Sequence, residues 1–182
     1  MRRQRGFSLV ELLIVVAIIL IIAAVAIPNL LRARIAANES SAVSAVRTIN
    51  TAEITFATAY PTVGYSPTLV ALGPGAGAVA CKPAGPKKAA ACLLDAALAN
   101  NVANGGKSGY TFDAVGVVKA PSTARGTYGV GAAPLVFNKT GVRRFCSEED
   151  GVLHFDKNTA GLTTRTTTGT AGCTIAPYLV LQ

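Results

Sequence analysis

Few residues of this chain combine the types and spacing that enzyme chemistry requires. His154 is the single histidine, and Asp156 follows it by two positions. Residues i and i+2 of a strand share a face, so this pair could orient an imidazole for proton transfer. A serine or cysteine nucleophile would have to join them, and no GxSxG elbow occurs in the sequence. We therefore expect no enzymatic activity and interpret the pair as polar residues on one face of a strand.

Metal and phosphate binding have little support in the sequence. Glu148, Glu149 and Asp150 are adjacent, whereas the ligands of an EF-hand alternate, so we interpret them as a solvated turn. The glycine-rich stretch GPGAG at 73–77 lacks the preceding strand and the Lys-Ser/Thr ending of a phosphate loop. The four cysteines form no CxxC pair, and with one histidine they make a poor zinc site. We expect no metal and no cofactor.

The most unusual chemical group is the carboxyl of Glu11, because it lies inside an apolar run. From Phe7 to Ile27 only Ser8 and Glu11 are polar. As a helix this run would be about 32 Å long, which matches a bilayer core of about 30 Å. The run can therefore span a membrane, and Glu11 is a candidate functional residue within it.

Three arginines precede the apolar run, at positions 2, 3 and 5. No acidic residue balances them, so the positive-inside rule predicts a cytoplasmic N-terminus and an exported C-terminal region. All four cysteines lie in that exported region, where oxidising conditions favour disulfides. Sequence permits three pairings. We favour Cys81 with Cys92 and Cys146 with Cys173, because each pair closes a local loop.

Three interpretations of the N-terminal segment compete. A secretory signal peptide would be cleaved near positions 24–26, but the apolar run exceeds the roughly 7 to 15 residues usual for that segment. A single-span anchor would leave Glu11 unexplained, and a carboxyl at the centre of an inserted helix costs about 3 kcal/mol. In the third, cleavage after Gly6 frees the amine of Phe7, which pairs with Glu11 of a neighbouring chain. At about 4 Å that attraction is on the order of 4 kcal/mol before desolvation.

The heptapeptide GFSLVEL at 6–12 resembles the prepilin cleavage and methylation signature of type IV pilins and of the pseudopilins of type II secretion. The resemblance implies that a membrane prepilin peptidase/methyltransferase cuts after Gly6 and methylates Phe7. It also implies that Glu11 directs filament assembly and that Pro28 kinks the helix. The implied partners are other copies of this chain, membrane lipid before assembly, and the pilus or secretion assembly machinery of the inner membrane.

The resemblance further implies a location and a layout. The precursor would lie in the inner membrane with its C-terminal region in the periplasm, and the mature form would belong to a surface or periplasmic filament. In the family, a long N-terminal helix packs against an antiparallel sheet that is followed by a disulfide-closed C-terminal region. The span from Cys146 to Cys173 lies where that closed region would be.

The helix that must position Glu11 is predicted to continue beyond the apolar run. Pro28 should kink it rather than end it, because residues 30–60 contain neither glycine nor proline. Pro61 and Gly64 then predict its end. Residues predicted near one face are Val43, Val46, Ile49 and Phe56, with Arg47, Asn50 and Glu53 as polar interruptions.

The rest of the chain predicts an α+β fold. Residues 61–109 are interpreted as a connecting loop, with a short helix over 87–100 that places Leu94 and Leu98 on one side. Alternating runs at 110–115, 134–138, 142–146 and 152–155 predict an antiparallel sheet of about four strands. Candidates for its apolar face are Phe112, Phe137, Phe145 and Phe155. The expected segments are the leader 1–6, the membrane or filament-core helix 7–27, its amphipathic continuation 28–60, the connecting loop 61–109, and the sheet with its closed C-terminal region 110–182.

Two main functions follow from the resemblance. The first is a structural subunit of a type IV pilus-like filament used in adhesion, motility or DNA uptake; the second is a pseudopilin that forms a short periplasmic filament for secretion. Cysteine pairing near the C-terminus favours the pilin. DNA itself is a conceivable partner, because 14 basic and 9 acidic residues remain after the first six residues, but no basic face with aromatics supports it. A membrane-tethered binding domain that never polymerises is a third class.

Overall fold

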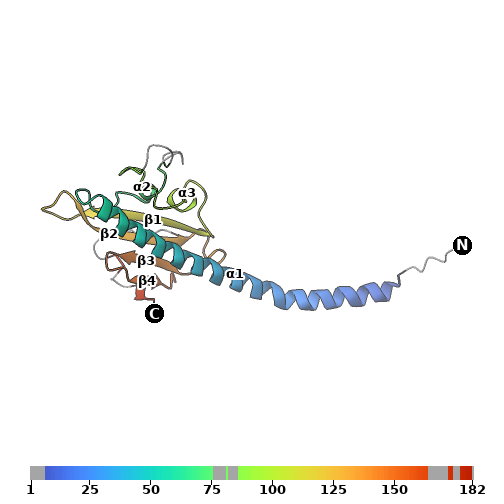
Figure 1. Cartoon of the computed structure of the whole chain (residues 1–182). Helices are drawn as coiled ribbons and strands as arrows, with labels where there is room; N and C mark the ends of the chain where they lie inside the picture. The colour runs from blue at the N-terminus through green and yellow to red at the C-terminus, as the bar shows by residue number, and fades with distance from the viewer. Residues whose placement is uncertain (1–6, 76–80, 82–85, 164–171, 174–176, 182) are drawn as a thin grey trace. The chain divides into compact units, whose positions relative to one another are not determined.

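The computed structural model describes residues 7–75, 81, 86–163, 172–173 and 177–181. The chain divides into two units, Met1–Arg34 and Ile35–Gln182. Its helices and strands are α1 (Leu9–Ala59), α2 (Leu69–Leu72), α3 (Ala96–Ala99), β1 (Tyr110–Val118), β2 (Arg125–Pro134), β3 (Arg144–Glu148), β4 (Leu153–Asp156) and β5 (Leu179–Val180). Figure 1 labels the helices and all of the strands except β5. A long N-terminal helix and an antiparallel sheet confirm the expected α+β, pilin-like fold.

The helix α1 continues through Pro28, as the sequence predicts. After Ala59 one further helical hydrogen bond forms, from the Tyr60 amide to the Phe56 carbonyl at 2.9 Å. Pro61 cannot donate the next one, and Gly64 then adopts a φ of +75°. The chain therefore leaves the helix within a residue of the predicted end.

In the second unit, α1 packs its apolar face on the sheet, and the teal part of α1 in Figure 1 lies along the strands. Val46, Ile49 and Phe56 are fully buried, as predicted, and Val43 is half-buried beside them. The helical residues of this core repeat with the spacing expected for one face of a helix. The core from α1 comprises Ala42, Ala45, Val46, Ile49, Ala52 and Phe56, and it meets Phe112, Tyr128, Val130 and Phe145 of the sheet.

Two of the predicted polar interruptions belong to this buried face. Asn50 donates a hydrogen bond to the hydroxyl of Ser147 at 2.8 Å, and a carboxylate oxygen of Glu53 accepts the Ser66 amide at 2.8 Å. Arg47 is exposed. Asn50 and Glu53 are buried because the strand and the loop provide hydrogen-bonding groups at those points, which the spacing of apolar residues could not reveal.

The sheet has five antiparallel strands in the order β1-β2-β3-β4-β5, one more than expected. The strand predicted at 134–138 was wrong, because β2 ends at Pro134 and residues 137–141 form a turn with Asn138 at a φ of +60°. The segment that forms β2, RGTYGVGAAP, was missed because its three glycines weaken the strand pattern. Phe112 and Phe145 are buried on the face that meets α1, and Phe155 is half-buried there, whereas Phe137 lies outside the sheet.

The helix predicted over 87–100 was wrong except for α3. Asp95 caps α3 by accepting the Leu98 amide at 2.8 Å. Before it, the amides of Leu93 and Leu94 both donate to the Leu72 carbonyl, at 2.7 and 3.0 Å. These tertiary bonds hold the segment extended, so they override the helix propensity of its alanines and leucines. Leu94 and Leu98 are nevertheless both buried, as expected.

Candidate functional site

The start of α1 is built from Ser8 and Glu11. The first helical hydrogen bond runs from the Leu12 amide to the Ser8 carbonyl at 3.2 Å. A carboxylate oxygen of Glu11, Oε2, accepts the Ser8 amide at 2.9 Å. This is one half of a capping box, in which an acid at the third helical position satisfies the amide before the helix. The Ser-x-x-Glu spacing carried that signal in the sequence, and the sequence analysis missed it.

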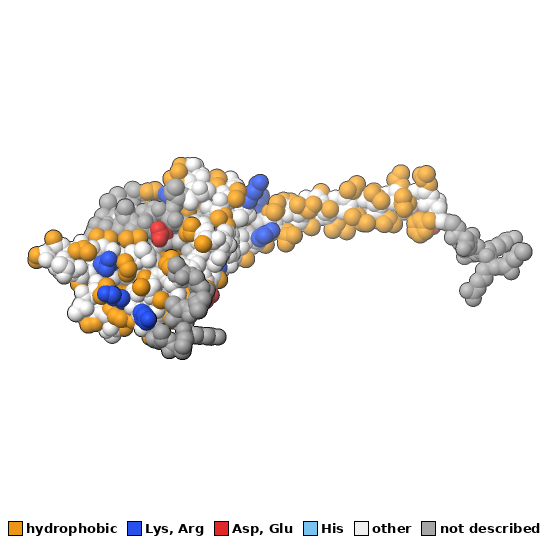
Figure 2. Space-filling model, turned by 90° about the horizontal axis from the view of Figure 1, so that it is seen from above, with side chains coloured by type: hydrophobic (Ala, Val, Ile, Leu, Met, Phe, Trp, Pro, Cys, Tyr) orange, Lys and Arg blue, Asp and Glu red, His pale blue; other side chains and the backbone are white. Residues whose placement is uncertain are grey.

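From residue 12 to residue 27 the helix of the first unit is apolar on all sides. The large side chains from Leu9 to Leu31 are each about half or more exposed, from 46% for Val16 to 77% for Leu9. The most apolar window has a mean hydropathy of 3.3, and α1 is the one described helix long and apolar enough to cross a membrane. On the face drawn in Figure 2, orange hydrophobic side chains follow one another along this helix, with white backbone between them. A helix that is hydrophobic all round requires an apolar environment, in a bilayer or among other helices.

The residues predicted for processing lie at and before this helix. Gly6 is outside the described residues, and Phe7 is 76% exposed. In the uncleaved chain the nitrogen of Phe7 belongs to a peptide bond, so it carries no charge for Glu11 to pair with. The capping contact therefore describes Glu11 before any cleavage, and its proposed contact with a neighbouring chain remains a prediction.

Both disulfides form in the pairing that the sequence analysis favoured. Cys81 bonds to Cys92, and Cys146 on β3 bonds to Cys173. The second bond belongs to a small buried cluster with Tyr178. Glu148 lies on the same face of β3 and accepts the Cys173 amide at 3.1 Å. The disulfide thus ties the C-terminal segment to the sheet face opposite α1.

The predicted polar face of β4 is buried. His154 and Asp156 are 6% and 5% exposed, and Asp156 binds the guanidinium of Arg144 across the strand pair at 3.0 Å through Nε. The Nδ1 atom of His154 has no hydrogen-bond partner among the described residues. The other oxygen of Asp156 accepts the Asn158 amide at 2.9 Å, so both oxygens bind groups other than His154.

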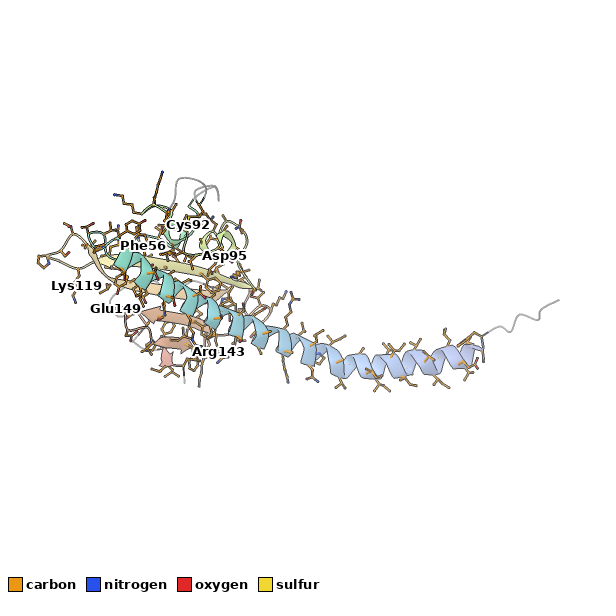
Figure 3. The ribbon with its side chains drawn as sticks, viewed as in Figure 1. Phe56, Cys92, Asp95, Lys119, Arg143 and Glu149 are labelled. Carbon is orange, nitrogen blue, oxygen red and sulfur yellow. A yellow bond between two sulfur atoms is a disulfide. The ribbon has the colours of Figure 1, made fainter. Side chains whose placement is uncertain are left out.

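The acidic turn divides into a buried and an exposed part. Glu148 is buried and bonds to Cys173, whereas Glu149, labelled in Figure 3, and Asp150 are exposed. Asp150 accepts the Val152 amide at 2.9 Å and so closes its own turn. In the part of the chain that the structure describes, no group of three potential metal ligands occurs.

Glu39 is a structural anchor that the sequence analysis did not identify. Its Oε1 accepts the amides of Val142 and Arg143 at 3.0 Å each, and its Oε2 binds the Arg143 guanidinium at 2.7 Å. Arg143 is labelled in Figure 3. These contacts fix α1 against the segment that leads into β3. The residues involved are more than 100 positions apart, so no local pattern could have predicted the pairing.

Comparison with known proteins identifies a known motif in the N-terminal segment. Residues 1–27 match the model of the prokaryotic N-terminal methylation motif. This match covers the leader, the predicted cleavage point and the whole apolar run, including Glu11.

Two curated relatives that match the N-terminal part of the chain are type IV pilins. Over 40 residues the chain is 65% identical to the type IV wide pilus major component PilA4 of Thermus thermophilus, which covers 22% of this chain and 30% of the relative. Over 54 residues it is 46% identical to the type IV major pilin protein PilA of Myxococcus xanthus, covering 30% of this chain and 24% of the relative. The chain therefore matches about a quarter to a third of each relative's length. No solved structure gives a significant match. These matches support the type IV pilin family.

Proposed function

We propose that this protein is a structural subunit of a type IV pilus-like filament and has no enzymatic activity. The observation that carries the proposal is the unpartnered apolar part of α1, joined to the N-terminal methylation motif. In this proposal a prepilin peptidase cuts after Gly6 and methylates Phe7. The apolar helices of many copies then pack together, because assembly removes their side chains from lipid into a close-packed core.

The charge of Glu11 gives this packing a register. After cleavage, the amine of Phe7 in one copy meets the carboxylate of Glu11 in the next. A subunit stacked out of step would leave Glu11 buried without an opposite charge, which costs several kcal/mol in an apolar core. The capping bond to Ser8 uses one carboxylate oxygen, so the other oxygen can accept from the amine.

The proposed location follows from the same segment. The precursor is held in the inner membrane by residues 7–27, with the positively charged leader in the cytoplasm and the second unit outside. That orientation agrees with the two disulfides of the second unit. The assembly machinery of the inner membrane then moves the subunit from lipid into a surface filament.

The N-terminal mass of the mature protein tests the proposal. Filaments sheared from cells would be purified, imaged by electron microscopy and digested for mass spectrometry. We expect this chain in the filaments, beginning at N-methylated Phe7. A chain that begins near residue 27 would show a signal peptide, and an intact Met1 would show a simple anchor. A methylated chain found only in the periplasm would instead assign it to the pseudopilins.

A further inference from the structure

A cavity of about 400 Å³ lies where the segment after α1, the turn at 87–90 and the β1–β2 loop meet. The residues that line it include two with cationic side chains, Lys88 and Arg125, and two threonines, Thr62 and Thr123. The remaining lining is apolar and consists of Val63, Pro67 and Ala89. No acidic side chain is among the described residues that line the cavity. Two like charges around one hollow create a positive potential that favours an anion.

Lys88 is held at the cavity by a closed turn. The Lys87 amide donates to the Ala90 carbonyl at 3.0 Å, and the Ala90 amide donates back to Lys87 at 2.8 Å. The next residue, Ala91, bonds through its amide to the carbonyl of Ala71 at 2.8 Å, and the disulfide of Cys92 follows. Lys88 therefore lies in a closed turn that is anchored to the fold on its C-terminal side, which limits the backbone ordering that binding would require.

Arg125 is held by a second set of backbone contacts. Its amide donates to the Val63 carbonyl at 2.9 Å, and its carbonyl accepts the Tyr65 amide at 3.1 Å. Gly64 lies between these two bonds, and a Cβ there would come within 2.1 Å of the Arg125 carbonyl oxygen. The close approach therefore requires glycine.

The side chain of Arg125 is available to a ligand. Its Cδ would lie 2.7 Å from a Cβ placed on Gly116, so its stem runs against β1. Among the described residues, no hydrogen bond or ion pair within 4 Å engages its guanidinium. The buried carboxyl of Glu53 acts on it only at longer range. A guanidinium presents a planar fork of donors that matches the oxygens of phosphate or sulfate.

We propose that this cavity binds a phosphate or sulfate group carried on a small organic molecule. Arg125 and Lys88 neutralise the anion, the threonine hydroxyls offer additional donors, and the apolar lining packs against the organic part. The volume suits a small ligand, since binding cavities for small molecules begin at about 300 Å³. The proposal does not rest on filament formation, because every residue involved lies in the second unit.

Titration of the full-length chain in a non-ionic detergent tests this proposal. Inorganic phosphate, sulfate and phenyl phosphate would each be added at constant ionic strength with chloride as the balancing ion. Backbone amide shifts of Thr62, Val63 and Thr123 would report binding. We expect saturation at these amides with all three anions, and several-fold tighter binding of phenyl phosphate than of inorganic phosphate. Equal affinities would restrict the site to the free ion, and shifts that never saturate would overturn the proposal.

Two neighbouring lysines provide a matched control. Lys88→Gln should weaken phenyl phosphate binding about tenfold, which corresponds to the loss of about 1.4 kcal/mol. Lys87→Gln removes the same charge one residue away from a side chain that is not among the lining residues, so it should stay within about twofold of the parent. Arg125→Lys retains the charge but loses the fork and should bind more weakly. Equal losses in the two glutamine variants would mean a diffuse positive field and would overturn the site.

Discussion

At the scale of the single residue, Glu11 performs one observed task and one proposed task. It caps its own helix through Ser8, and it is proposed to pair with the amine of a neighbouring copy after cleavage. The two tasks differ in their chemistry, because capping needs only an acceptor oxygen whereas pairing needs a negative charge. Replacing Glu11 with glutamine distinguishes the capping task from the pairing task.

We predict that Glu11→Gln reduces filament assembly about as severely as Glu11→Ala, by about tenfold or more. Membrane insertion should be unchanged in both variants. Glutamine retains an oxygen for the Ser8 amide but carries no charge. The measurement is the amount of sheared filament relative to membrane-inserted precursor. Assembly restored to the parent level by glutamine, but not by alanine, would show that capping rather than charge pairing is what assembly requires.

Glu53 is the second residue whose charge state matters. It is fully buried, and burial raises the pKa of its carboxyl from 4.5 to about 7, although the Ser66 amide and Arg125 both favour the charged form. Oε1 of Glu53 and the hydroxyl of Tyr128 have no hydrogen-bond partners among the described residues. A protonated carboxyl can donate a hydrogen bond as well as accept one, so the neutral form suits this environment better.

The free energy of unfolding should therefore fall as the pH rises from about 4.5 to about 7. Below this pH range the carboxyl of Glu53 is protonated in both the folded and the unfolded protein, and above it the carboxyl is ionised in both. The total loss is about 3 kcal/mol. Glu53→Gln, which keeps an acceptor for Ser66, should flatten this contribution and be the more stable protein at pH 8. Denaturant unfolding in non-ionic detergent at pH 5 and pH 8 measures it, and identical pH slopes for the two proteins would contradict the argument.

At the scale of the element, the N-terminal helix was predictable and much of the sheet was not. The 21-residue apolar run and the Pro61–Gly64 pair fixed the limits of α1 within about two residues, because both depend on local chemistry. The strand β2 was missed because three of its residues are glycine, and its strand character comes from pairing with β1 and β3. For the same reason the sequence did not predict the partners of Glu39 and Glu53, because these partners lie in other segments of the chain.

Asn101 joins the segment after α3 to the edge of β1. Its amide nitrogen donates to the carbonyls of Leu98 and Phe112, and its oxygen accepts the Phe112 amide at 2.7 Å. We predict that Asn101→Ala lowers the free energy of unfolding by about 2 to 4 kcal/mol, because it leaves buried backbone groups unpaired. Denaturant unfolding measures the change. Asn100→Ala, which loses one longer bond to Gly75 at 3.3 Å, is the control and should cost clearly less.

The two disulfides close loops of different length, with separations of 27 and 11 residues. In the loop-entropy description they contribute about 3.5 and about 3 kcal/mol. We predict a larger loss for the paired change Cys146→Ser with Cys173→Ser than for Cys81→Ser with Cys92→Ser. The first also frees the segment whose Cys173 amide bonds to buried Glu148. Denaturant unfolding measures the free energy of unfolding of each double variant. A greater loss in the variant without the bond between Cys81 and Cys92 would contradict this ranking.

At the scale of the whole molecule, the two units have opposite requirements. The side chains of the first unit need an apolar environment, whereas the hydrophobic core of the second unit draws all its residues from position 42 onward. The second unit should not depend on the first for its folding. That separation would let the proposed subunit move from lipid into a filament without rearranging the core of its second unit.

We predict that a fragment covering Ile35–Gln182 folds without detergent and remains monomeric. Its far-ultraviolet circular dichroism should show both helix and sheet, and its cooperative unfolding should match that of the same unit in the full chain. The full chain in detergent-free buffer should instead associate through its exposed apolar side chains. A fragment that aggregates or unfolds without a cooperative transition would show that the second unit needs the first.

The contacts along β1 also limit how copies of this protein can join. The amide of Phe112 bonds to Asn101 and that of Gly116 to the Ser66 carbonyl, so those outer-edge donors of β1 are already occupied. At the other edge of the sheet, β5 has only two residues. Amyloid-like growth requires long strands with unpaired edges. Both edges of this sheet therefore disfavour strand-to-strand association between copies of the protein.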